Sequence, residues 1–130
     1  MSSTEIPFRY LSTAEVVQLA LDTVGTVDGL DREALYLAVR RTAEGEPAEA
    51  HARIHEYAAA LLEGLLSYHP FTRGNVDVAG RALRRFYELN GWRLHEDDAE
   101  VHQLVADMQT GRASVFAGAE VLARRAEYTR

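Results

Sequence analysis

Apolar residues recur at helical spacing in several separate stretches of the chain, and capping residues mark where these stretches begin. The first stretch runs from about Thr13 to Val24, with Ser12 and Glu15 as a capping box at its start and Gly25 after its end. Asp31 is placed to cap a second helix. No stretch alternates apolar and polar residues as a half-buried strand does. The pattern predicts helices and no sheet.

The longest predicted helix lies in the middle of the chain, from about His51 to Ser67. The segment before it, Thr42 to Ala50, contains Gly and Pro and few strand-forming residues, so we expect a loop there. A broad apolar face predicts that this is the central helix of the fold. The residues of that face are Ile54, Ala58, Leu61, Leu62, Leu65 and Leu66.

Three further helices are expected in the second half of the chain. Their start and stop signals are Asn75 with Asn90 and Gly91, Asp97 and Glu100 with Gly111, and Ser114 with an end near Tyr128. Together the signals predict a compact all-α bundle of about six helices, forming one domain over residues 1–130.

Composition limits the kinds of partner and the cellular compartment that we expect for this protein. The 20 acidic and 14 basic residues give a formal net charge of −6, which disfavours nucleic acid as a partner. Cysteine is absent, so disulfides and thiolate metal sites are excluded. No apolar run approaches the ~20 residues that cross a bilayer, and the first residues do not have the pattern of a signal peptide. We therefore expect a cytoplasmic protein without membrane contact.

The segment from Tyr68 to Asp77, YHPFTRGNVD, lies between two strongly helical stretches and carries the candidate chemistry. His69 falls on the connecting loop, next to the start of the following helix. A helix start offers free N–H groups and a positive dipole end, which favour a bound anion. A general base beside an anion site is what phosphoryl or nucleotidyl transfer to a hydroxyl requires.

This segment resembles the motif of the Fic/Doc (death-on-curing) family, H-P-F-x-[D/E]-G-N-[G/K]-R between two helices. Flanking segments match in the same order: Tyr10-Leu11-Ser12 with Glu15, Glu56 with Ala58-Ala59, Glu88 to Trp92, and the Doc-like stretch from Asp97 to Gly111. The resemblance implies a Fic/Doc-type helical bundle and a transferase that moves AMP or phosphate from a nucleotide to a protein hydroxyl. Proteins of this kind, which include AMPylation enzymes, are commonly toxins held by a small antitoxin.

The resemblance also implies roles for individual residues. His69 would be the catalytic base that takes the proton from the attacking hydroxyl. Pro70 and Phe71 would belong to the structural part of the motif, with Phe71 as a core anchor for the loop. Gly74 and Asn75 would shape the anion hole.

Three positions depart from the family pattern. Arg73 stands where the family has an acidic residue that holds magnesium, Val76 where it has Gly or Lys, and Asp77 where it has the Arg that grips the phosphates. A nucleotide with magnesium is the cofactor that the resemblance implies, and these replacements disfavour it, so the cofactor is left unknown and no metal site is predicted. Asp77 favours the positive helix end and could occupy the anion site itself.

Arg73 and Arg81 each lie four residues from Asp77. Either could pair with its carboxylate, and Arg73 could receive a substrate phosphate directly. A surface ion-pair cluster of little energetic value is an equally good interpretation. His51 and His55 have a spacing that can hold a metal, but no third ligand is evident, and we expect no site there.

The sequence leaves three functions open. The first is a Doc-like transferase with a degenerate phosphate and magnesium site. The second is a catalytically inactive Fic-fold protein that binds a partner. The third is a retooled enzyme that uses His69 on a peptide or small molecule, for example in a biosynthetic pathway. A protein or peptide is the expected partner. An antitoxin or a homo-oligomer is compatible with each of the three functions. Docking of a target strand before the central helix is not expected, because Thr42 to Ala50 has few strand formers.

Overall fold

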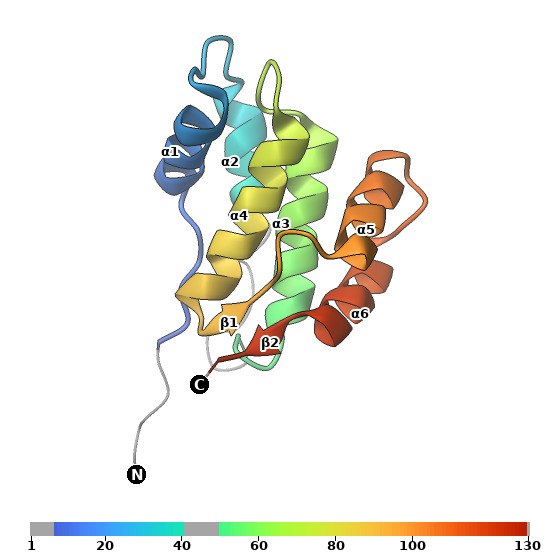
Figure 1. Cartoon of the computed structure of the whole chain (residues 1–130). Helices are drawn as coiled ribbons and strands as arrows, with labels where there is room; N and C mark the ends of the chain where they lie inside the picture. Colours follow the sequence, from blue (N-terminus) through green and yellow to red (C-terminus); the bar gives the residue numbers. More distant parts are fainter. Residues whose placement is uncertain (1–6, 41–49, 130) are drawn as a thin grey trace.

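The computed structural model describes residues 7–40 and 50–129, and it is an all-α fold with one very small sheet (Figure 1). The predicted loop and the missing flap strand fall almost entirely on residues 41–49, outside the described residues. No helix in the described part is long and apolar enough to cross a membrane. The elements in chain order are α1 (Thr13–Val24), α2 (Arg32–Arg40), α3 (Ile54–Tyr68), α4 (Asn75–Leu89), β1 (Trp92–Arg93), α5 (Ala99–Gln109), α6 (Val115–Arg125) and β2 (Glu127–Tyr128).

Helix α3 is the centre of the fold, as its broad apolar face predicts. It packs against α2, α4, α5 and α6, so it is surrounded on several sides (Figure 1). All six apolar residues named for its face are buried. Gly64 allows a close approach of α2, because a Cβ at this position would lie 3.0 Å from the backbone oxygen of Ala38. The arrangement fixes the end of α3, and with it the position of His69.

The first two helices begin as the sequence predicts. The Glu15 N–H donates to Ser12 Oγ at 3.1 Å and the Ser12 N–H donates to Glu15 Oε1 at 3.0 Å, which completes the capping box of α1. Gly25 ends α1 in a left-handed conformation. Asp31 Oδ1 accepts from the Ala34 N–H at 3.0 Å at the start of α2. These local signals confirm the predicted boundaries of this half of the fold.

Two predicted helix boundaries are wrong. Helix α3 begins at Ile54 and not at His51, because residues 51–53 form a turn and Arg53 is the N-cap without a side-chain cap bond. The stop signal at Gly111 is confirmed, because α5 ends at Gln109, Thr110 is its C-cap and Gly111 follows with a positive φ of 75°. Helix α6 ends at Arg125 instead of near Tyr128, because the chain leaves it in an extended conformation at Ala126.

That extended end forms the strand pair that the sequence pattern did not indicate. Trp92 pairs with Tyr128 and Arg93 with Glu127 in an antiparallel register. Two residues a strand are too few to produce a recognisable alternation of apolar and polar positions. The pairing ties the C-terminal segment to the residues that follow α4.

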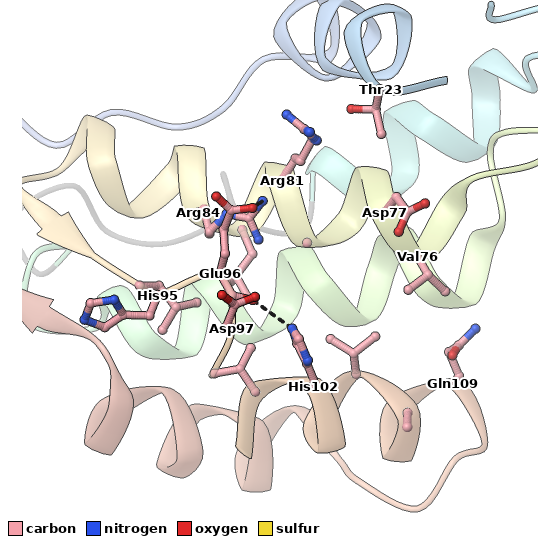
Figure 2. A pocket seen from close by; sticks show the side chains of 16 residues that line it. Thr23, Val76, Asp77, Arg81, Arg84, His95, Glu96, Asp97, His102 and Gln109 are labelled. Atoms are coloured by element: carbon pink, nitrogen blue, oxygen red, sulfur yellow. Dashed lines mark hydrogen bonds and ion pairs between the residues drawn. The ribbon is translucent and has the colours of Figure 1, made fainter. Parts of the chain in front are cut away.

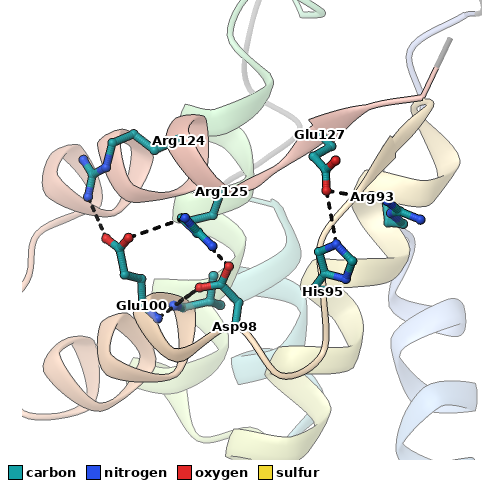
Figure 3. A network of polar contacts seen from close by, with 8 residues as sticks. Arg93, His95, Asp98, Glu100, Arg124, Arg125 and Glu127 are labelled. Atoms are coloured by element: carbon teal, nitrogen blue, oxygen red, sulfur yellow. Dashed lines mark hydrogen bonds and ion pairs between the residues drawn. The ribbon is translucent and has the colours of Figure 1, made fainter.

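Helix α5 is capped by Asp98 and not by Asp97. Asp98 Oδ1 accepts from the N–H groups of Glu100 and Val101, while Oδ2 accepts from Arg125 Nε on α6 at 2.7 Å (Figure 3). The spacing from Asp97 to Glu100 suggested a capping box, but a contact between two helices selects the next residue. Asp98 therefore joins the start of α5 to the end of α6.

Asn90 has a larger role than ending α4. Its side chain is fully buried, and its Oδ1 accepts from the Arg9 N–H at 2.8 Å. Its Nδ2 donates to the backbone oxygens of Arg9 and Phe86, both at 2.9 Å. This one amide holds the segment before α1 against the end of α4.

Candidate functional site

His69 is the C-cap of α3, and its backbone has a left-handed conformation with φ 48° and ψ 57°. Among the described residues it is the only residue other than glycine with positive φ. Its side chain is exposed, and in the described part of the chain no hydrogen bond orients the imidazole. A non-glycine residue in this region is uncommon and costs conformational energy, so the surrounding loop must hold it there.

The loop after His69 is fixed by buried apolar residues and hydrogen bonds. Pro70 and Phe71 are buried, which is the position expected for the anchor Phe71. The Asp31 N–H donates to Pro70 O at 2.8 Å, and the Thr72 hydroxyl donates to Asp28 O at 2.9 Å. The connection between α1 and α2 thus holds the loop from one side.

Asn75 holds the loop from the other side, and its predicted role as the N-cap is wrong. Gly74 is the N-cap of α4, and Asn75 is the first helical residue. Asn75 Oδ1 accepts from the Phe71 N–H at 3.0 Å, and its Nδ2 donates to Phe71 O at 2.8 Å. The amide turns back because the partly buried backbone groups of Phe71 need partners. It clamps the loop to the helix.

Gly74 is required by its conformation and by its surroundings. Its φ is +80°, and a Cβ there would lie 2.5 Å from Val24 Cγ2 at the end of α1. A larger residue would push the start of α4 away from α1. Gly74 therefore sets how closely the loop and α1 approach.

The start of α4 keeps N–H groups that a ligand could use. The first intrahelical hydrogen bond runs from the Val78 N–H to Gly74 O at 2.9 Å. The N–H groups of Asn75, Val76 and Asp77 precede it and have no intrahelical acceptor. The side chains of Val76 and Asp77 are exposed, so the amides adjoin a surface carrying a carboxylate.

The charged residues around this helix start do not form the predicted ion-pair cluster. Within the described residues, neither Arg73 nor Arg81 forms a salt bridge with Asp77, and Figure 2 shows Asp77 and Arg81 well apart. Arg73 lies elsewhere, lining a cavity of about 240 Å³ with Phe71 and Thr72 and the connection between α1 and α2. Arg73 therefore faces a different surface from Asp77 and Arg81.

A larger cavity of about 700 Å³ lies between α4, the segment 94–97 and α5 (Figure 2). Val76, Asp77 and Arg81 belong to its wall, whereas His69 does not. The sequence did not indicate that further polar side chains share this wall. Arg84 could have been found from its spacing of seven residues from Asp77, but the contribution of α5 depends on the tertiary fold. The further polar residues of the wall are Thr23, Arg84, His95, Glu96, Asp97, His102 and Gln109.

The histidines considered as metal ligands serve in packing. His55 Nδ1 lies 2.8 Å from the hydroxyl of buried Tyr87, and its ring meets Trp92 edge-on at 4.8 Å. Burial lowers the pKa of His55 and raises the pKa of Tyr87, so a neutral imidazole and a protonated phenol share this hydrogen bond. His51 packs edge-on against Phe8 at 5.1 Å. No group of three or more metal-ligating side chains occurs among the described residues.

The fold and the loop define an all-α domain with an exposed histidine on a clamped loop before a helix start. The sequence matches no model of a known protein family, and no curated protein matches it. The likeness to the Fic/Doc family rests on the residues of the motif and of its flanking segments.

Proposed function

We propose that this chain is a Doc-like Fic-domain protein derived from transferases that move AMP or phosphate to a protein hydroxyl. In this proposal His69 is the general base, and the target is a hydroxyl on a protein or peptide. The base takes the hydroxyl proton while the hydroxyl oxygen attacks phosphorus of a nucleoside triphosphate and an existing P–O bond breaks. Pyrophosphate leaves when AMP is transferred, and a nucleoside diphosphate leaves when phosphate is transferred. A small antitoxin, self-association and a cytoplasmic site of action belong to the same proposal.

The observation that carries the proposal is the form of the loop. His69 has an exposed imidazole and a left-handed backbone conformation, and it begins the short loop that leads into α4. The first amides of α4 have no intrahelical acceptor. The hydrogen bonds from Asn75 to both backbone groups of Phe71 keep that loop in place. Such rigidity is of use where a base must meet a bound group at a fixed position.

The charge at the start of α4 supports a degenerate phosphate site. Two unit charges ~4 Å apart interact by ~4 kcal/mol at an effective dielectric near 20. With Asp77 in place of an arginine, that interaction becomes repulsive for a phosphate near the first turn. We infer that ordinary magnesium-nucleotide chemistry is weak in this chain, or that His69 acts on another electrophile.

A second candidate is an inactive Fic-fold protein that binds a partner. It is favoured by the surroundings of His69, since the imidazole has no orienting hydrogen bond in the described part of the chain. The apolar side chains of Tyr68 and Val76 are exposed on either side of the loop. A partner protein could cover these side chains without any chemistry at His69.

Substitution of His69 by Ala distinguishes the two candidates. The intact protein and the His69→Ala variant would each be expressed in a bacterial host, and the cellular proteins compared by mass spectrometry. The proposal predicts an added phosphate or AMP that depends on His69. If host growth or partner capture changes equally with both proteins and no modification appears, the binding function replaces the transferase.

A further inference from the structure

The cavity between α4 and α5 has the size of a small-molecule site and is separate from His69. Its volume of about 700 Å³ falls within the range of ~300–1,000 Å³ that is usual for ligand pockets. Part of its lining is apolar and buried, contributed by Leu83, Leu94 and Val101. An apolar floor with a few polar groups is the usual composition of such a site.

One face of α4 places opposite charges at opposite ends of this cavity. Asp77, Gly80 and Arg84 follow one another at spacings of three and four residues, so they share a face of the helix. Asp77 and Arg84 are two turns apart, or ~10 Å along the axis. At that separation they cannot pair with each other, and a ligand between them meets an anion at one end and a cation at the other.

Neither charge is strongly neutralised by the protein. Asp77 has no salt bridge within the described residues. The nearest carboxylate oxygen to Arg84 belongs to Glu96, at 3.8 Å, and the Glu96 side chain is 74% exposed. Figure 2 shows Arg84 beside Glu96 at one end of the cavity and Asp77 at the other. Both charges are therefore available to a ligand.

Gly80 keeps the middle of this face open. A Cβ at Gly80 would meet nothing closer than Arg84 Nη1, at 3.9 Å, and its φ is outside the left-handed region. Neither the backbone conformation nor a close neighbour therefore requires glycine here, although glycine is disfavoured within a helix. Its effect is to leave room for a ligand between the two charges.

We propose that this cavity binds a small zwitterion, either a free basic amino acid or the end of a short peptide. The cationic group of the ligand lies at Asp77, its carboxylate lies at Arg84, and its aliphatic part lies over Gly80 and the apolar floor. A polyanion is a poor fit, because the carboxylates of Asp77, Glu96 and Asp97 outnumber the two arginines of the wall, Arg81 and Arg84. The proposal does not use His69, although it shares Asp77 with the proposed function.

Isothermal titration calorimetry with L-arginine and agmatine tests the charge pattern. Agmatine has the same guanidinium group but lacks the carboxylate. We expect arginine to bind at millimolar concentration or better and agmatine to bind at least tenfold more weakly. The dipeptide arginyl-leucine separates the two sources, since tighter binding than arginine favours a peptide end and weaker binding favours a free amino acid. No binding of any probe, or equal binding of arginine and agmatine, overturns the proposal.

Variants of α4 locate the site. Arg84→Gln should reduce arginine binding to the level of agmatine, whereas Arg85→Gln, its exposed neighbour, should leave it unchanged. Gly80→Leu fills the open middle and should abolish binding, with circular dichroism used to check that the variant is folded. His69→Ala should bind arginine normally even if transfer chemistry is lost. Unchanged arginine binding in Arg84→Gln, or in folded Gly80→Leu, contradicts the assignment.

Discussion

Asn75 holds the loop that follows the candidate base His69, because its side chain links this loop to α4. Asn75→Ala leaves the N–H and the C=O of Phe71 without their partners. We expect a loss of ~1–3 kcal/mol in the free energy of unfolding, measured by urea denaturation. Gln18→Ala is a suitable control, since it removes a single exposed hydrogen bond to Asp22 and should cost no more than ~0.5 kcal/mol. Equal costs would show that the clamp is not a structural requirement.

Gly74 is a second residue on which the loop depends. Gly74→Ala places a methyl group against Val24 in addition to the cost of a positive φ. Gly111→Ala is the matched control, because Gly111 also has positive φ but its Cβ would meet nothing within 4 Å. We expect Gly74→Ala to be the more destabilising by ~1–3 kcal/mol in thermal or urea unfolding. A smaller cost at Gly74 than at Gly111 would mean that the approach to α1 is not tight.

His55 gives the fold a pH dependence. Burial lowers the pKa of His55, so the unfolded chain binds its proton more readily than the folded chain. Stability should therefore fall as the pH drops from about 6.5 through the folded pKa. Urea midpoints at several pH values would measure this slope, which His55→Gln should reduce. An unchanged slope in His55→Gln would place its origin elsewhere.

At the scale of elements, the contact between Asp98 and Arg125 joins α5 to α6. The Asp98 side chain is 3% exposed, and burial raises its pKa, but hydrogen bonds from Arg125, Val101 and Glu100 outweigh burial and hold the pKa below its ordinary value. The stabilising contribution is complete above about pH 4 and is lost as the pH falls through the folded pKa.

Asp98→Asn keeps an acceptor for the helix start and removes the charge. At pH 7 we expect a loss of ~1–2 kcal/mol in the free energy of unfolding, and the difference from the native chain should shrink in acid. Arg124→Ala, which removes an exposed pair with Glu100 and an exposed, long hydrogen bond to Glu120 O, should cost no more than ~0.5 kcal/mol. Chemical denaturation at pH 7 and pH 3 measures both. A difference that grows in acid would contradict the assigned sign.

The sequence predicted elements well where the signal was local. The capping box of Ser12 and Glu15, the cap at Asp31 and the apolar face of α3 all depend on residues a few positions apart. It failed where a distant partner decided the structure. Asp98 replaced Asp97 as the cap because it also binds Arg125, 27 residues away. Asn75 is a local exception, since its side chain bonds to Phe71 four residues earlier instead of capping α4.

The same distinction applies to the candidate site. The motif indicated His69 and the inverted charge at Asp77, and both lie at the junction of α3 and α4. The sequence did not indicate that Asp77 shares a cavity with α5 while His69 does not. That arrangement follows from how α4 and α5 pack, which no short spacing reveals.

At the scale of the whole molecule, the formal net charge of −6 also opposes an anionic ligand. A test of the proposed phosphate site with inverted charge must separate this long-range effect from the local effect of Asp77. Asp77→Arg and Asp22→Arg raise the net charge equally, but Asp22 lies on α1, outside the wall of the large cavity. Comparing the two variants isolates the contribution of the helix start.

The most direct measurement is isothermal titration calorimetry of ATP with magnesium on the native chain and on these two variants. We expect no measurable binding to the native chain at micromolar concentration and a gain of at least tenfold in Asp77→Arg, with little change in Asp22→Arg. Tight binding of magnesium-ATP by the native chain, or an equal gain in both variants, would contradict this expectation.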